Sequence, residues 1–145
     1  MKHPDGLKRG IRMLVSTKGR YALRVMIDLA DHNTGEYITL KDIAERQGIS
    51  EKYLESIIVV LSKAGLLDGL RGKGGGYRLN RPAEEYTLGE ILGLVENTLA
   101  PVSCLDCGPG GCDCERAVEC RTLPIWQNLQ SRIDEYLNSV TLAEL

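Results

Sequence analysis

The sequence has no apolar run long enough to cross a bilayer, which argues against an integral membrane protein. Basic residues near the N-terminus (Lys2, Lys8, Arg9 and Arg12) are not followed by an apolar segment with a cleavage site, so no secretion signal is expected. We therefore expect a cytoplasmic protein without a membrane partner. With 145 residues, 43% of them hydrophobic, the chain is long enough for one compact domain plus an appendage.

The residue patterns of common catalytic machineries are also missing. Both histidines, His3 and His32, lie far upstream of the cysteines, and no serine stands in a nucleophile elbow. The stretch Gly72–Gly76 precedes Tyr-Arg-Leu, whereas a phosphate-binding P-loop ends in Gly-Lys-Ser/Thr ahead of a helix. A redox enzyme or electron-transfer protein that uses the cysteines is the competing class, but no motif supports it. The sequence therefore predicts that the protein is not an enzyme.

Cysteine is absent from most of the chain, and all five cysteines fall within seventeen residues. Thiols grouped among glycines, in a chain without a secretion signal, indicate metal ligands or redox thiols rather than structural disulfides. One tight C-x2-C pair is present, where zinc favours two, and the remaining uneven spacings suit an iron-sulfur cluster. Cluster, zinc site and disulfide switch all remain open for this cysteine segment, which holds Cys104, Cys107, Cys112, Cys114 and Cys120.

Charge is divided unevenly along the chain. Residues 1–82 hold 15 Lys and Arg against 9 Asp and Glu, a net charge of +6, whereas residues 83–145 hold 3 against 11, a net charge of −8. A basic half of this kind is suited to DNA phosphates, and an acidic half is kept away from them.

Residues 39–61 have the pattern of a helix-turn-helix. Thr39 is placed to cap a short helix over Leu40–Gln47, with Asp42 as the reciprocal partner of a capping box, and Gly48 ends that helix. Ser50 is placed to cap a second helix, whose apolar residues recur at helical spacing: Leu54, Ile57, Ile58 and Leu61. This stripe leaves Lys52 and Glu55 on the outer face, where side chains near the N-terminus of a second helix meet base edges in a major groove.

A glycine-rich hairpin follows this pair of helices. Gly65 ends the second helix, and residues 66–71 and 76–79 read as two short strands around a tip that needs positive φ. Arg71 and Lys73 at this tip are cations with little bulk around them, which suits a phosphate backbone or a narrow minor groove. The sequence therefore predicts a wing.

Helices are also predicted before and after the helix-turn-helix and its hairpin. Residues 15–30 carry an apolar stripe, with Ser16 or Thr17 as cap, and Lys18 and Arg20 in the first turn are expected to hold a backbone phosphate. Thr87–Glu90 forms a second predicted capping box, which opens a helix to about Val95.

A long final helix begins near Pro124 and carries an apolar stripe with no later segment to cover it. Its apolar side chains are Ile125, Trp126, Leu129, Ile133, Tyr136 and Leu137. We expect this stripe to pack on the same helix of a second chain, because helix-turn-helix proteins usually bind as dimers to two half-sites. The alternative is packing on its own domain alone.

The predicted fold is mainly α with a small β-hairpin wing, an α+β class. We expect a flexible N-terminal extension or an upstream translational start at residues 1–12, and a winged helix-turn-helix domain at residues 13–82. Residues 83–145 would form a cysteine-loop and dimerisation region.

Four stretches in order, STKGRYALRVMIDLA, DIAERQGISEKYLESI, LRGKGGGYRL and ECRTLPIW, closely resemble the IscR-like (Rrf2) family of winged-helix transcription regulators. The resemblance covers roughly residues 13–145. It implies a homodimeric regulator, expected to be a repressor, that binds a palindromic promoter site through its recognition helix and wing. It also implies an iron-sulfur cluster whose state alters DNA affinity, with a zinc-bound or thiol-switched regulator as the alternative.

The resemblance also assigns candidate residues. The cluster ligands fall on Cys104, Cys114 and Cys120, although Cys107 suits the first position equally, since this loop is about two residues longer. The fourth ligand is open because Leu123 stands where the cluster regulator has a histidine; Cys107, Cys112, an acidic residue or the partner chain are candidates. We expect 2Fe-2S in preference to 4Fe-4S. The base-reading positions fall on Lys52, Glu55 and Arg71.

Overall fold

The computed structural model describes residues 15–106 and 114–145. The expected N-terminal extension (residues 1–12), Cys107 and Cys112 therefore lie outside the described residues. The described elements are α1 (Thr17–Asp31), α2 (Leu40–Gln47), α3 (Glu51–Lys63), β1 (Leu67–Leu70), β2 (Gly76–Leu79), α4 (Leu88–Val95) and α5 (Leu123–Ser139), with short 3-10 helices at Ala83–Glu85, Ser103–Leu105 and Leu142–Glu144. None of the described helices combines the length and the apolarity needed to cross a membrane.

The predicted helix starts are confirmed, because the side chains expected to cap them do so. Ser16, Thr39, Ser50 and Thr87 each accept a hydrogen bond from the backbone N–H three residues on. Gly48 ends α2 at a φ of 63°, so the turn between α2 and α3 uses the left-handed region that favours glycine. The helix-turn-helix geometry thus follows from local signals.

Both predicted capping boxes lie in the described part of the chain, and in each only one of the two bonds is formed: the N-cap side chain accepts from the backbone N–H three residues on, but the return bond from the acidic side chain is missing among the described contacts. Asp42 N–H donates to Thr39 and Glu90 N–H donates to Thr87, both at 3.1 Å. The Asp42 side chain is one methylene shorter than the glutamate of a full box, and the Glu90 carboxylate accepts from Arg81 instead.

The first strand is shorter than predicted at both ends. Leu66 belongs to the turn that caps the C-terminus of α3, because its N–H bonds to Leu61 O at 3.0 Å while Gly65 N–H bonds to Ser62 O at 3.0 Å. With Gly65 at a φ of 80°, this is a Schellman motif. Arg71 lies in the turn, and β1 pairs antiparallel with β2 in a register that opposes Leu67 to Leu79.

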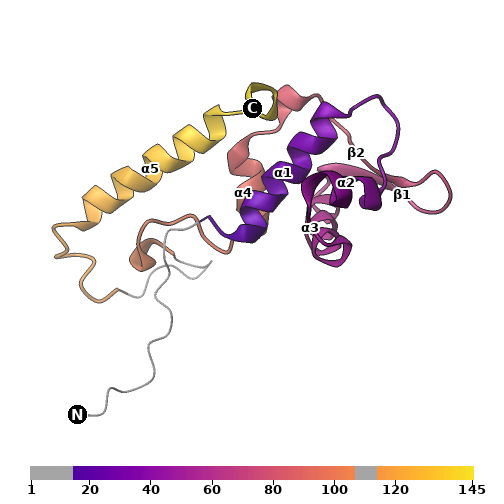
Figure 1. Cartoon of the computed structure of the whole chain (residues 1–145). Coiled ribbons are helices and arrows are strands. Elements are labelled where there is room, and N and C mark those ends of the chain that lie inside the picture. The colour runs from indigo at the N-terminus through magenta and orange to yellow at the C-terminus, as the bar shows by residue number, and fades with distance from the viewer. Residues whose placement is uncertain (1–14, 107–113) are drawn as a thin grey trace, which may run out of the picture.

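One hydrophobic core holds the elements together. Met26 of α1, Ile43 of α2 and Leu54 of α3 pack in the same cluster as Ile91 of α4 and Leu142 beyond α5. Figure 1 shows the hairpin loop and α5 at opposite ends of the molecule, with α1 and α4 between them. The predicted mainly α fold with a β-hairpin is therefore observed.

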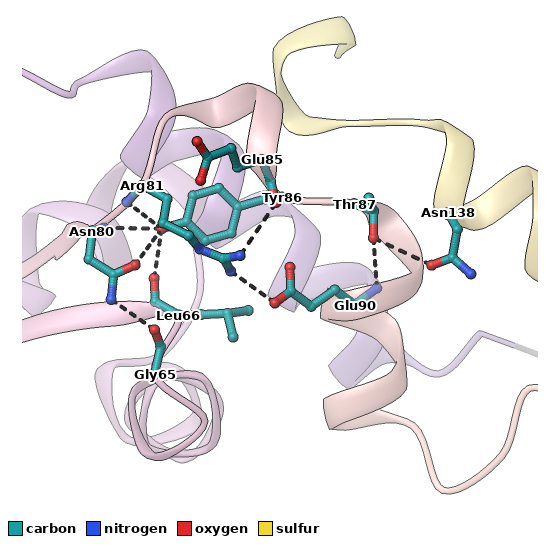
Figure 2. Close-up of polar contacts among 9 residues, drawn as sticks. All are labelled: Gly65, Leu66, Asn80, Arg81, Glu85, Tyr86, Thr87, Glu90 and Asn138. Carbon is teal, nitrogen blue, oxygen red and sulfur yellow. Dashed lines mark hydrogen bonds and ion pairs between the residues drawn. The ribbon is translucent and has the colours of Figure 1, made fainter.

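Tyr86, just before α4, is wholly buried, and its hydroxyl forms hydrogen bonds with several backbone groups at the base of the hairpin (Figure 2). It donates to Leu66 O at 2.8 Å and accepts from the backbone N–H groups of Asn80 and Arg81 at 3.0 and 3.1 Å. The Arg81 guanidinium lies 4.3 Å from the ring centroid and donates to Glu90 at 2.9 Å. Satisfied polar groups thereby fix the hairpin to α4.

Candidate nucleic-acid interface and cysteine segment

The outer face of α3 presents the two side chains predicted to read bases. Lys52 and Glu55 are exposed and one helical turn apart, while the apolar stripe of α3 faces the core. Tyr53 between them is half-buried and packs edge-to-face on Tyr21 of α1, with ring centroids 5.8 Å apart. The structure therefore places a hydrogen-bond acceptor, Glu55, and a cation, Lys52, on the same exposed face of α3.

A buried carboxylate holds α2 in place against α1. Asp28 is 2% exposed, and it accepts from Arg46 through both oxygens, at 2.9 and 2.7 Å, and from Gln47 at 2.9 Å. Arg24 of α1 donates to the side chain and the backbone carbonyl of Gln47. These bonds fasten the residues just before the turn, so they set the direction in which α3 leaves it.

The pKa of Asp28 reflects this environment. Burial by itself raises the pKa, but the hydrogen bonds from Arg46 and Gln47, with the charges of Arg46 and His32, outweigh it and leave the pKa below its ordinary value of 3.8. Asp28 is therefore a carboxylate held ionised inside the fold.

The hairpin tip depends on glycine. Gly72 and Gly74 have φ values of 92° and 74°, and a Cβ on Gly76 would overlap the backbone carbonyl of Ile38. Arg71 and Lys73, the predicted wing cations, are both exposed in this loop. The tip therefore presents two positive charges on a loop that has few other side chains.

The N-terminus of α1 already contacts a carboxylate. Ser16 donates to Glu96 Oε1 through its backbone N–H at 2.8 Å and its hydroxyl at 2.9 Å, and a Cβ on Gly19 would overlap the Glu96 carboxylate. Lys18 is half-buried and Arg20 is exposed in this first turn. A phosphate at these two cations would share the helix end with Glu96, which lies just before the cysteine segment.

The described cysteines are not gathered into one site. Cys114 is exposed, Cys104 and Cys120 are half-buried, and the described residues contain no group of three or more His, Cys, Asp or Glu that could hold a metal ion. Cys120 Sγ lies 3.4 Å from Thr122 Oγ1. Hydrogen bonds from the Thr122 side chain, the Thr122 backbone and the Leu123 backbone outweigh desolvation and lower the pKa of Cys120. This favours the thiolate, the form that binds metals and attacks disulfides.

Three residues that organise the site were missed by sequence reasoning. Asp28 carried a usable signal, because it is an acid within an otherwise apolar face of α1. Tyr86 and Glu96 carried none, because Tyr86 reaches across to Leu66, 20 residues away, and Glu96 to Ser16, 80 residues away.

Comparisons with known proteins agree with this geometry. A family model described as Rrf2, "Iron-dependent Transcriptional regulator", matches residues 15–145. The HTH-type transcriptional regulator IscR of Photobacterium profundum is 42% identical over 133 residues, which cover 92% of this chain and 75% of that protein.

Among solved structures, T. potens IscR is similar with a TM-score of 0.70 and 40% identity, covering 90% of this chain and 84% of that chain. CymR, the global cysteine regulator of B. subtilis, is similar with a TM-score of 0.71 and 34% identity, covering 90% and 94%.

Proposed function

Because the chain belongs to the Rrf2 family and is a DNA-binding transcription regulator rather than an enzyme, we propose that it is a homodimeric repressor controlled by an iron-sulfur cluster. The observation that carries the proposal is the placement of all five cysteines between α4 and α5, in a chain matched by a family described as iron-dependent. We also propose that it acts in the cytoplasm, where the DNA of bacteria such as those of its relatives lies.

The proposed DNA interface is the outer face of α3 with the hairpin tip. Glu55 accepts from a cytosine amino group and Lys52 donates to a base edge or phosphate, while Arg71 enters a narrow minor groove. Lys73, Lys18 and Arg20 serve as phosphate contacts that set the register. The target is a double-stranded palindromic promoter site, and affinity for it falls steeply with salt as counterions are released. Affinity that does not change between low and moderate salt would contradict this interface.

Helix α5 is proposed as the dimer helix. No residue of α5 is buried in the single chain, and Ile125 and Tyr136 of its apolar stripe are 59% and 66% exposed. Ile133→Asp places an unpaired charge in this seam and is expected to give a monomer that no longer spans two half-sites. The matched control is Ser131→Asp on the same helix, where Ser131 is exposed. Sedimentation of both variants tests the seam.

The cysteine segment is the proposed cluster site. Its donor chemistry fits, because thiolates are the usual iron-sulfur ligands and the environment of Cys120 favours the thiolate. Cys114 and Cys120 are the proposed ligands of a 2Fe-2S cluster, with Cys104, Cys107 and Cys112 as candidates for the remaining positions. When bound, the cluster supplies a group that oxidants or iron shortage can remove. The chain's own part is to hold α5 and α4 in different relative positions with and without it, which shifts the population of DNA-competent dimers.

Anaerobic purification with iron and sulfide assays tests the cluster. We expect iron and sulfide in the wild type, loss of both in Cys120→Ala and Cys114→Ala, and retention in at least one of the other three single variants, since five thiols exceed the needs of one cluster. Promoter binding is then measured with and without iron. Full iron retention in Cys120→Ala refutes the ligand assignment, and identical promoter binding in both states refutes the sensing role.

A thiol-switched regulator is the second candidate. It is favoured by the similarity to CymR, described as a global cysteine regulator, and by the lowered pKa of Cys120. In that case the purified protein carries no iron, and DNA affinity changes with a thiol oxidant and is restored by a reductant. A zinc-bound form is recognised in the same assay by its metal content.

A further inference from the structure

A groove of about 280 Å³ separates the C-terminal half of α3 from the hairpin. The residues that define this α3–hairpin groove are Val59, Ser62 and Lys63 of α3, with Gly69, Leu70, Arg71 and Tyr77 of the hairpin. Among these residues only Arg71 belongs to the proposed DNA interface. The groove continues from the face of α3 that carries Glu55 to the wing.

The charge of the groove is of one sign. Lys63 and Arg71 are exposed, none of the lining residues is acidic, and neither cation takes part in an ion pair with any described residue. Arg78, elsewhere on the hairpin, differs because it pairs with Asp68 at 3.5 Å. The two cations of the groove have no such partner among the described residues, which makes the groove suited to a polyanion.

The groove is also partly apolar. Val59 and Leu70 are 38% and 48% exposed along its walls. Gly69 leaves the floor of the groove without a side chain, and a Cβ there would crowd the Tyr77 ring at 3.2 Å. Apolar walls beside a hydroxyl and two cations match the chemistry of a sugar-phosphate strand, in which deoxyribose carbons alternate with anionic phosphates.

The position of the groove selects the same occupant. A helix in a major groove and a wing in the adjacent minor groove are separated by one strand of DNA backbone, and the groove lies between α3 and the wing. We propose that the α3–hairpin groove receives this strand, with Lys63 and Ser62 contacting a phosphate and Val59 and Leu70 contacting deoxyribose. The proposal rests on the proposed DNA-binding function and adds Val59, Ser62, Lys63 and Leu70 to the interface.

The first test compares Lys63→Gln with Lys63→Arg on a labelled mixed-sequence duplex of about 30 base pairs, long enough for two half-sites. Because a phosphate contact is independent of sequence, Lys63→Gln is expected to weaken binding about three- to tenfold on every duplex tried and to reduce the salt slope by about 1. Lys63→Arg keeps the charge and is expected to restore both values. Melting curves should be similar for the two variants, because Lys63 is exposed.

The second test introduces a charge without changing shape. Val59→Glu and Val59→Gln alter the same exposed wall with nearly identical side chains, and only the glutamate repels a phosphate. We expect Val59→Glu to bind at least about fivefold more weakly than Val59→Gln at low salt, with the gap closing as salt rises.

These outcomes separate the groove from the function. If the wild type binds DNA but Lys63→Gln keeps its affinity and salt slope, or if Val59→Glu and Val59→Gln lose equally, the strand does not occupy the groove and the proposed function stands. If the wild type fails to bind any duplex, including promoter fragments, both proposals fall.

Discussion

Helices α3 and α5 carry apolar side chains at the same helical spacing, yet the structure treats them in opposite ways. Leu54, Ile57, Ile58 and Leu61 of α3 are all fully buried, whereas α5 has no buried residue. A periodic stripe therefore predicts that a helix has an apolar face but not which partner covers it. For α3 the partner lies within the chain, and for α5 we propose that it is a second copy.

The largest expected effect separates the two helices directly. Leu54→Ala removes a fully buried side chain, and we expect it to lower the free energy of unfolding by about 2–5 kcal/mol, measured in urea. Leu129→Ala removes the same atoms from a side chain that is 38% exposed, and we expect a smaller loss of about 1–2 kcal/mol from the chain itself. Further loss should depend on protein concentration, as a dimer contact requires. Equal, concentration-independent losses would show that α5 is supported within its own chain.

A smaller effect is expected at Tyr86, whose hydroxyl joins the base of the hairpin to the start of α4. Tyr86→Phe leaves Leu66 O and the N–H groups of Asn80 and Arg81 without their buried partner, which should cost about 1–3 kcal/mol. Tyr136→Phe on α5 is the matched control, because Tyr136 is 66% exposed. Similar unfolding curves for the two variants would mean that the hydroxyl of Tyr86 does not fix the hairpin to α4.

Acid should also act on the α3 side of the molecule. Because the folded pKa of Asp28 lies below its ordinary value of 3.8, its contribution to stability is complete above about pH 5 and is lost as the pH falls through the folded pKa. In Asp28→Asn, stability at neutral pH is expected to be lower and its decline in acid shallower. Asp31→Asn, an exposed position on the same helix, should keep the wild-type pH profile.

The smallest effect is expected at the contact between α4 and the start of α1. Glu96→Gln removes the charge that faces Ser16 and the first turn of α1, and we expect a loss of at most about 1 kcal/mol. Glu84→Gln, at an exposed carboxylate, is the matched control and should change the unfolding free energy little. A higher free energy of unfolding in Glu96→Gln would show that the carboxylate destabilises the N-terminus of α1.

The parts of the molecule that could be predicted from the sequence are the local ones. They depend on residues only a few positions apart, so they can be recognised in the sequence alone. Examples are the helix caps at Thr39 and Ser50, the left-handed Gly48 and the glycine-rich hairpin. The bonds of Asp28 to Arg46, of Tyr86 to Leu66 and of Ser16 to Glu96 join residues 18, 20 and 80 positions apart. No spacing rule reaches that far, so the groups that orient α2, the hairpin and α1 emerge only in the folded chain. The DNA and cluster roles of the candidate residues stay predictions.

The segment after α5 returns to the start of α4, where Leu88 N–H donates to Val140 O and Leu142 N–H donates to Tyr86 O, each at 3.0 Å. In terms of chain entropy, these bonds hold the ends of α4 and α5 together, so the connection between the two helices, which includes the cysteine segment, joins two ends that are already fixed. The cost of closing a flexible loop grows slowly, by about 0.6 kcal/mol for each doubling of its length. Insertions and deletions among the cysteines should therefore be cheap for the fold. Changes in the length of that segment are therefore expected to leave α2, α3 and the hairpin in their places.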